Sequence, residues 1–212
     1  MSDVKVKLCG MMRECDIAYA NEAKPDYVGF VFAGTKRKIS YDMAKKFRQN
    51  LSDNIKAVGV FVDEDISVAA DMLNEGMIDI AQLHGSEDND YILKLKRMTG
   101  CEVIKAVRVA SEEDITGACR LDADYLLFDA YIEGTNGGTG KTFQWDIIER
   151  AYSVLPNGTG KPFFLAGGIN TKNVCGAVAL SPYGIDISTG IETGGFKDRD
   201  KMIDIVRRIR DV

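Results

Sequence analysis

Two residues with reactive side chains stand at the ends of apolar runs in the sequence. Cys9 closes the run 4–9 and is followed directly by Gly10, and Asp129 closes the run 125–129. A thiol, with an ordinary pKa of about 8.5, becomes a useful base where neighbouring positive charge lowers that pKa. A carboxyl group that ends an apolar strand is costly to bury unless it is paired or used. A facing thiol and carboxyl group would suit a proton acceptor and a proton donor.

Both residues also have a purely structural interpretation. Cys9 could be a small buried hydrophobic residue, and Asp129 could cap the following loop. The remaining cysteines fall in helical segments or at a strand start, and we interpret them as structural: Cys15, Cys101, Cys119 and Cys175.

Two glycine-containing segments follow the last two apolar runs, at residues 166–170 and 188–192. The paired Gly167 and Gly168 would let backbone N–H groups approach an anion, and a short helix start after residue 188 could point further N–H groups at the same place. Together the segments predict a phosphate site. A Gly-Thr-Gly-Lys-Thr segment at 138–142 resembles the end of a nucleotide-binding loop, but Thr135 stands where that pattern needs glycine.

Two further polar positions follow apolar runs. The pair Lys36-Arg37 could be solvated surface, or its arginine could clamp a substrate carboxylate with its forked guanidinium. His84 could line a binding site or be a hydrogen-bonded structural residue. It is the only histidine of the chain, which excludes triads that need a second histidine and argues against a zinc hydrolase or other metal site.

The elements that must position these residues form a regular series. Eight short apolar runs occur at 4–9, 27–32, 57–61, 78–83, 103–107, 125–129, 163–166 and 185–187. Continuous apolar runs are typical of strands buried on both faces. Helical periodicity separates them, for example at 41–51, 66–74, 91–98, 145–152 and 201–210.

The spacing of these runs predicts an α/β fold with parallel strands. Their ends are roughly 21 to 29 residues apart, apart from one gap of about 37, as in repeated βα units. Eight units without a linker predict a single (β/α)8 TIM-barrel domain over residues 1–212; the alternative is an open doubly wound sheet. In such a barrel, chemistry lies at the carboxyl ends of the strands. The loop 134–140 in the long gap is interpreted as a functional loop on that face.

Composition limits the partners and the compartment. The net charge of −5 gives no electrostatic reason to expect binding to nucleic acid or an anionic membrane. The chain has no apolar signal region near residues 1–7 and no membrane-spanning apolar stretch. Five cysteines without a CxxC pair are expected to be free thiols in a reducing cytoplasm.

Taken together and in order, these segments resemble the phosphoribosylanthranilate isomerase family. The similar motifs are Lys-Leu-Cys-Gly-Met at 7–11, residues 26–32 with Lys36-Arg37, Gln-Leu-His-Gly at 82–85, 127–129, 137–140, 166–169 and 186–192. The resemblance extends from about residue 4 to 205. It implies a barrel enzyme of tryptophan biosynthesis that performs an Amadori rearrangement on a small-molecule substrate, phosphoribosylanthranilate, without metal or cofactor.

The resemblance also implies residue roles. Asp129 would be the general acid that opens the sugar ring, and Cys9 the base that removes the C2 proton. Arg37 would hold the anthranilate carboxylate, and Asp186 the polar part of the substrate. The phosphate would be held by Gly167, Gly168, Ser188 and Thr189.

Some positions depart from the family pattern. Met11-Met12-Arg13 replaces a smaller or hydroxylated residue, Thr189 replaces a common serine, and Ala33-Gly34-Thr35 replaces a serine-rich stretch near the expected carboxylate site.

Two other functions remain as alternatives. One is the sister isomerase of the histidine pathway, in which a carboxylate base stands at the position of Cys9. The other is a catalytically silent sugar-phosphate binder. The expected state is a monomer or a homodimer.

Overall fold

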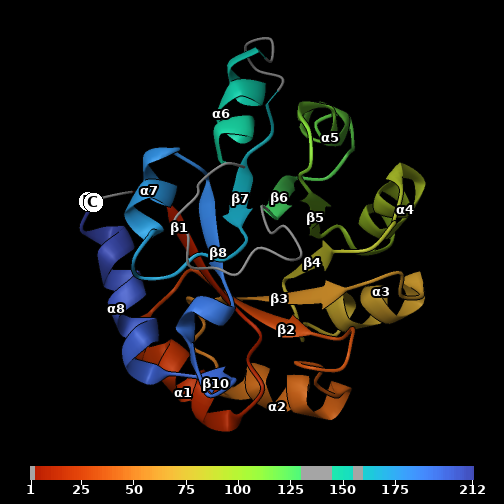
Figure 1. The fold of residues 1–212 in the computed structure, drawn as a ribbon. Helices are drawn as coiled ribbons and strands as arrows, with labels where there is room; N and C mark the ends of the chain where they lie inside the picture. The colour runs from red at the N-terminus through yellow and green to blue at the C-terminus, as the bar shows by residue number, and fades with distance from the viewer. Residues whose placement is uncertain (1–2, 130–144, 155–159) are drawn as a thin grey trace.

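Eight parallel strands pair in sequence order, and the last pairs with the first, so the sheet closes into a barrel (Figure 1). The computed structural model describes residues 3–129, 145–154 and 160–212. The strands are β1 Lys5–Cys9, β2 Tyr27–Val31, β3 Lys56–Phe61, β4 Ile80–Leu83, β5 Glu102–Arg108, β6 Tyr125–Asp129, β7 Phe163–Ala166 and β8 Gly184–Ile187. The predicted α/β class and the (β/α)8 barrel are confirmed.

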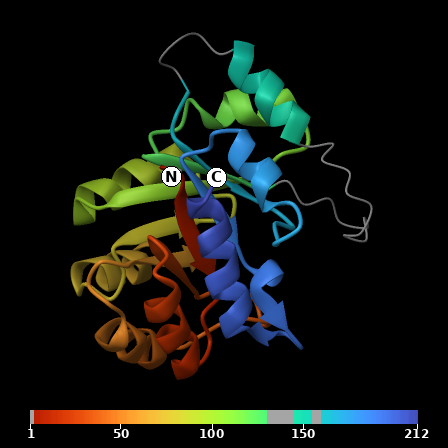
Figure 2. The same ribbon diagram turned by 90° about the vertical axis from the view of Figure 1, so that its left-hand side faces the viewer.

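A helix follows each barrel strand and lies on the outside of the barrel (Figures 1 and 2). The helices are α1 Glu14–Ala23, α2 Tyr41–Asn50, α3 Ile66–Asn74, α4 Asn89–Thr99, α5 Glu112–Ala118, α6 Trp145–Val154, α7 Val174–Ala179 and α8 Arg199–Arg210. Between β8 and α8 lie a short 3-10 helix, η1 Thr189–Ile191, and a hairpin of β9 Glu192–Thr193 with β10 Phe196–Lys197.

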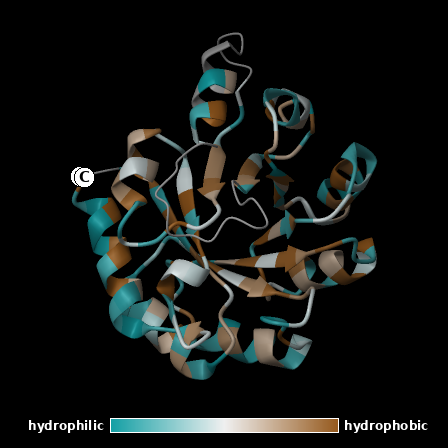
Figure 3. Cartoon of the chain, viewed as in Figure 1, coloured by the Kyte–Doolittle hydropathy of each residue, from teal (hydrophilic) through white to brown (hydrophobic). Residues whose placement is uncertain are grey.

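The strands separate two apolar layers, because successive side chains of a strand point to opposite faces. Val6 and Leu8 belong to the layer between barrel and helices. Val58 and Leu127 belong to the layer that fills the barrel interior. Figure 3 shows the result, with hydrophobic strands inside and hydrophilic outer faces on the helices. Because apolar side chains cover both faces of the strands, the strand sequences are continuous apolar runs.

The same alternation decides which polar residues enter the barrel. On β1, Lys7 and Cys9 share one face, and on β6 Asp129 shares the inner face of Leu127. On β8, Asp186 faces inward in the same way, because its neighbours Ile185 and Ile187 belong to the outer layer.

Local signals start and stop the helices. Ser40 caps α2 by accepting a hydrogen bond from the Met43 N–H, and Asp88 caps α4 by accepting one from the Tyr91 N–H. Gly100 ends α4 in the left-handed conformation, with φ of 69°. These caps satisfy backbone groups that a helix end would otherwise leave without partners.

Several expectations about the chain can be compared with these elements. The eight predicted strands and the five predicted helices are present, with ends that differ by a few residues. The β9–β10 hairpin was not predicted, because its two-residue strands carry no periodicity. The expected functional loop at 134–140 and the segment 138–142 lie outside the described residues. All five cysteines are free thiols, as predicted. Within the described ranges, no helix is both long enough and apolar enough to cross a membrane.

Candidate active site

A cavity of about 620 Å³ opens at the carboxyl ends of the barrel strands. Nine described residues to which the sequence assigned chemistry or binding line it: Cys9, Arg37, His84, Asp129, Gly167, Gly168, Asp186, Ser188 and Thr189. These residues come from six different strand ends or the loops that follow them. The inward alternation of the strands therefore brings together side chains that are far apart in the sequence.

Cys9 ends β1 with its thiol almost fully buried, at 8% exposure. The strand pairing sets Gly29 of β2 opposite Cys9, and a Cβ atom at Gly29 would lie only 2.6 Å from the Cys9 Sγ. A glycine is thus needed at this position to leave room for the thiol. Gly29 was not singled out in the sequence as a functional position, although a glycine inside a buried strand often marks such a close approach.

The charges around Cys9 oppose one another. Burial raises the pKa of the thiol, Lys7 and Lys197 lower it, and Asp186 raises it. The net direction is upward, so ionising Cys9 to the thiolate that a base requires costs more free energy than ionising a free thiol. Burial, the largest cause, together with the charge of Asp186 penalises the charged thiolate more than the two lysines stabilise it.

Lys7 lies beneath Cys9 as a fully buried cation. Its Nζ is 2.9 Å from Asp186 Oδ1, and the two residues are direct neighbours across the β1–β8 pairing. Burial lowers the pKa of Lys7, but the charges of Asp186 and Cys9 raise it by more, so the net direction is upward and the ammonium keeps its proton. Lys7 was not predicted as a site residue. The available signal was a lysine between the apolar residues Val6 and Leu8 of a buried strand, since such a charge needs a partner.

His84 follows β4 and lies beside the proposed acid. Its Nε2 is 3.9 Å from Asp129 Oδ2, and its Nδ1 is 3.0 Å from Gln82 Nε2. Burial lowers the pKa of His84, which favours the neutral ring near pH 7. With Nδ1 accepting from the Gln82 amide, the neutral ring carries its proton on Nε2, the atom that faces Asp129. His84 lines the cavity and is also hydrogen-bonded to Gln82, so the structure is compatible with both interpretations of this residue.

Arg37 belongs to the loop after β2 and is held by an ion pair. Its Nε and Nη2 donate to the two carboxylate oxygens of Glu192 at 2.8 and 2.9 Å. Lys197 donates to Glu192 Oε1 at 2.8 Å and to the Ser188 carbonyl at 3.0 Å. Although burial raises the pKa of Glu192, its hydrogen bonds from Arg37 and Lys197 lower it to about 2. Glu192 and Lys197 were not predicted as site residues, because only folding brings them to Arg37.

The glycine segments after β7 and β8 meet at the same end of the barrel. Gly167 and Gly168 have φ values of 95° and 66°, which favour glycine. A Cβ at Gly190 would lie 2.0 Å from the Ile169 carbonyl oxygen, so Gly190 permits the two loops to touch. Asn170 donates to the Gly168 carbonyl at 3.0 Å and fixes its direction. The predicted phosphate segments are therefore adjacent in space.

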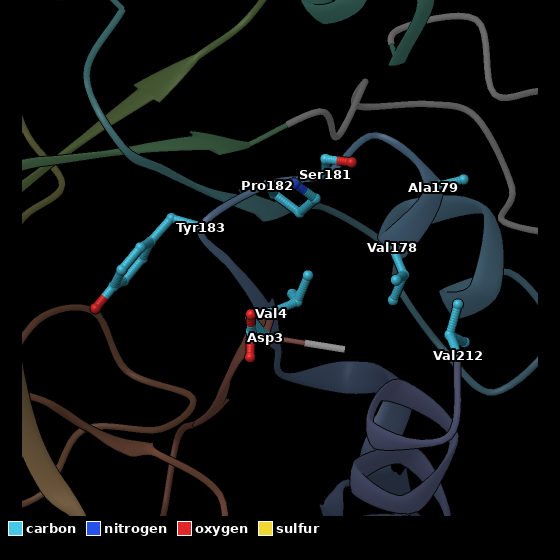
Figure 4. A pocket seen from close by; sticks show the side chains of 8 residues that line it. All are labelled: Asp3, Val4, Val178, Ala179, Ser181, Pro182, Tyr183 and Val212. Atoms are coloured by element: carbon cyan, nitrogen blue, oxygen red, sulfur yellow. The ribbon is translucent and has the colours of Figure 1, made fainter. Parts of the chain in front are cut away.

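A second hollow lies near the opposite end of the barrel and is lined by residues as far apart in the sequence as Asp3 and Val212 (Figure 4). Val4, Val178 and Val212 line it, and its Tyr183 side chain extends away to a hydrogen bond of 2.8 Å with the Tyr27 hydroxyl. Asp3 is the only acidic side chain among its eight lining residues. This apolar hollow lacks a paired acid and base, in contrast to the cavity around Cys9.

The polar groups of the main cavity suit proton transfer and anion binding. Among the described residues, no group of three histidine, cysteine, aspartate or glutamate side chains is arranged to hold a metal ion. The cavity is lined by a thiol, a carboxyl group with a neighbouring imidazole, an arginine that is ion-paired with Glu192, and residues of two glycine-containing loops. Such a set can bind an anionic sugar derivative and move protons on it.

Comparison with known proteins identifies the family. The model of the N-(5'-phosphoribosyl)anthranilate (PRA) isomerase family matches residues 6–208. A relative named N-(5'-phosphoribosyl)anthranilate isomerase from Endomicrobium trichonymphae is 44% identical over 209 residues, which cover 98% of this chain and 99% of the relative.

Solved structures agree with this match. The crystal structure of phosphoribosyl anthranilate isomerase from Thermotoga maritima is similar with a TM-score of 0.85 and 31% identity, over 99% of this chain and 100% of that one. A phosphoribosyl anthranilate isomerase in complex with reduced 1-(o-carboxyphenylamino)-1-deoxyribulose 5-phosphate is similar with a TM-score of 0.82 and 29% identity, over 99% and 100%. The chain belongs to the N-(5'-phosphoribosyl)anthranilate isomerase family.

Proposed function

We propose that this chain isomerises N-(5'-phosphoribosyl)anthranilate, an aminoaldose, to the corresponding aminoketose in tryptophan biosynthesis. One observation carries the proposal: Cys9 and Asp129 line one cavity together with Arg37 and residues of the adjoining glycine loops. The family match and the relative solved with a reduced product analogue support the same substrate.

The reaction divides between an acid and a base. The Asp129 carboxyl group gives its proton to the furanose ring oxygen, the C1–O bond breaks, and the anthranilate nitrogen lone pair forms a C=N bond with C1. The Cys9 thiolate then takes the proton from C2, and the C2–H electron pair moves to give an enolamine. Tautomerisation of the enolamine yields the ketose. General acid–base steps of this kind contribute roughly 10²–10⁴-fold each.

The other polar residues would hold the substrate around this centre. Arg37 would bind the anthranilate carboxylate, since a guanidinium matches a carboxylate with two parallel hydrogen bonds. Asp186 and His84 would contact the sugar. The phosphate would be held by the backbone and hydroxyl groups of Gly167, Gly168, Ser188 and Thr189.

The remaining features of the proposal concern the whole chain. The acid–base route requires no metal and no cofactor. Residues 1–212 would form one barrel domain that works as a monomer or homodimer in the cytoplasm, where five free thiols are stable. We expect no nucleic-acid or membrane partner.

The test is an assay of the purified protein with freshly prepared phosphoribosylanthranilate. Anthranilate-type fluorescence should decay rapidly with the wild-type chain and should persist with Cys9→Ala, whose rate should fall by about 10³-fold or more. Circular dichroism checks that the variant is folded. A folded wild-type chain that leaves the fluorescence unchanged would contradict the proposal and redirect the assay to the histidine-pathway aminoaldose. A Cys9→Ala variant with the wild-type rate would remove Cys9 as the base.

A further inference from the structure

Glu192 holds the guanidinium of Arg37 along one edge. Glu192 Oε1 accepts from Arg37 Nε at 2.8 Å, and Glu192 Oε2 accepts from Arg37 Nη2 at 2.9 Å. Such a two-point pair fixes the plane of the guanidinium as well as its position. Arginine has five N–H donors in a rigid fork, so Nη1 and its edge are not part of this pair.

Arg37 is at the same time a wall of the cavity. Its side chain is 19% exposed and lines the space shared with Cys9 and Asp129. A Cβ atom at Gly10, directly after Cys9, would lie 2.6 Å from Arg37 Cδ. The arginine stem therefore packs over the backbone next to the proposed base, and a small rotation of the guanidinium would change what a bound carboxylate meets.

Glu192 is itself fixed on the hairpin that follows β8. Its side chain is 8% exposed, and Lys197, whose side chain is fully buried, donates to Oε1 at 2.8 Å. Lys201 Nζ donates to the Glu192 backbone carbonyl at 2.7 Å. The pairing of β9 with β10 sets Lys197 directly opposite Glu192. The carboxylate thus has little freedom to follow a moving arginine.

The charges of this cluster leave a surplus for an anion. Arg37 and Lys197 contribute two positive charges, and Glu192 offsets one of them. Lys197 also donates to the Ser188 carbonyl at 3.0 Å, which links the cluster to the proposed phosphate loop. A substrate carboxylate would neutralise the remaining positive charge, and it would bind without the free-energy cost of reorienting the Arg37 side chain.

We infer that Glu192 is a specificity-determining positioning residue, which holds Arg37 so that its second edge faces the carboxylate of the aromatic part of the substrate. Glu192 is not among the described residues that line the cavity, so it would act through Arg37. The inference rests on the proposed function, because it takes Arg37 as the site of that carboxylate. Its role is to make the chain select anthranilate derivatives over aniline derivatives that lack the carboxylate.

Binding measurements test this role without requiring turnover. The probes are reduced 1-(o-carboxyphenylamino)-1-deoxyribulose 5-phosphate and the same compound without its aromatic carboxyl group, each titrated calorimetrically into wild-type protein, Glu192→Gln and Arg37→Met. In Glu192→Gln the amide NH₂ would oppose the Arg37 Nη2 donor, so the guanidinium should lose its fixed plane. We expect Kd for the carboxylate probe to rise about 10- to 100-fold in both variants. Kd for the carboxyl-free probe should change less than about threefold.

A matched control removes an ion pair at the other end of the barrel. Glu102 starts β5 and pairs with Lys56 at 3.2 Å, so Glu102→Gln should leave both Kd values unchanged. Equal weakening of both probes in Glu192→Gln would show a merely structural role and overturn the inference. It would also be overturned if Arg37→Met lost selectivity while Glu192→Gln kept it.

The same experiment separates this inference from the proposed function. If the wild-type chain turns over phosphoribosylanthranilate and Glu192→Gln keeps its selectivity, only the positioning role is wrong. If the wild-type chain neither binds the carboxylate probe nor turns over the substrate, the proposed function is wrong and the inference is overturned with it.

Discussion

Lys7 and Asp186 face each other across the β1–β8 pairing, with 2.9 Å between Lys7 Nζ and Asp186 Oδ1. The pair lies beneath Cys9, and its two members act on the thiol in opposite directions: Lys7 lowers the pKa of Cys9, and Asp186 raises it. A buried ion pair of this kind contributes little net stability, because desolvation offsets most of the attraction. The importance of this ion pair for the site is electrostatic, since its two charges influence the pKa of the proposed base, Cys9.

This arrangement predicts opposite effects of two substitutions on the ionisation of Cys9. Lys7→Met should raise the thiol pKa by about one unit, and Asp186→Asn should lower it by a similar amount, because it leaves Lys7 free to pair with the thiolate. The measurement is the pH dependence of Cys9 alkylation, followed by mass spectrometry of the peptide that contains Cys9. Lys105→Met provides a control, since Lys105 is a buried lysine paired with Glu87 at 2.8 Å. Shifts of the same sign in both variants would contradict the opposed charges.

The fold could be predicted from the sequence because every barrel strand is covered on both faces. This burial gives each strand a continuous apolar run, and the polar residue at the end of a run then marks the barrel mouth. Cys9 and Asp129 were found in this way, whereas the role of Asp186 was inferred from the family resemblance. The hairpin of β9 and β10 has no such run and was missed.

The electrostatic partners of the site could not be predicted in the same way. Lys7 and Asp186 are 179 residues apart, and Arg37 and Glu192 are 155 residues apart. Only closure of the barrel and the turn after β8 bring these charges together. The sequence shows that a charged residue in a buried strand needs a partner of opposite charge, but it does not show which residue that partner is.

Asp129→Asn should remove the proposed acid while keeping the shape of the side chain. An amide cannot supply the proton that opens the furanose ring, so kcat/KM for phosphoribosylanthranilate should fall by roughly 10²–10⁴-fold. The Kd of the reduced product analogue should change little, because that compound has no ring to open. Stopped-flow fluorescence and calorimetry give the two numbers. A variant with unchanged kcat/KM would assign the acid role elsewhere, and the neighbouring His84 would be the first candidate.

Gly29→Ala should disturb the thiol from the neighbouring strand. Its new Cβ would lie 2.6 Å from Cys9 Sγ and 3.1 Å from Cys9 Cα, so both strands must give way. Overpacking of this kind costs about 1–3 kcal/mol of unfolding free energy, and displacement of Sγ should lower kcat. Urea unfolding and the fluorescence assay measure the two effects.

The control for that substitution is Gly117→Ala. Gly117 lies in α5, where an added Cβ would meet no atom within 4 Å. Alanine there should stabilise the chain by about 0.5–1 kcal/mol and leave turnover unchanged. If Gly29→Ala were as stable and as active as Gly117→Ala, the close approach of Gly29 to Cys9 would not matter for stability or for turnover.

The ion pairs of Glu192 should make part of the stability of the chain depend on acid. The folded pKa of Glu192 is about 2, below the value of about 4.3 expected in the unfolded chain. The folded state therefore binds fewer protons between these values, and the contribution of Glu192 is complete above pH 5 and is lost as the pH falls through 2. At pH 6 Glu192→Gln should be less stable than the wild-type chain by about 1–3 kcal/mol.

That difference should shrink as the solution is acidified. As the pH falls, the free energy of unfolding should decrease more steeply for the wild-type chain than for Glu192→Gln. The two slopes should differ by up to about 1.4 kcal/mol per pH unit, which corresponds to the uptake of one proton on unfolding. Urea unfolding at pH 6, 4 and 3 measures the two slopes, with Glu102→Gln as the exposed ion-pair control, which should cost less than about 1 kcal/mol at pH 6. Parallel slopes for the wild-type chain and Glu192→Gln would mean that the two cations do not hold this carboxylate ionised. Arg37 would then lack the fixed partner on which its orientation depends.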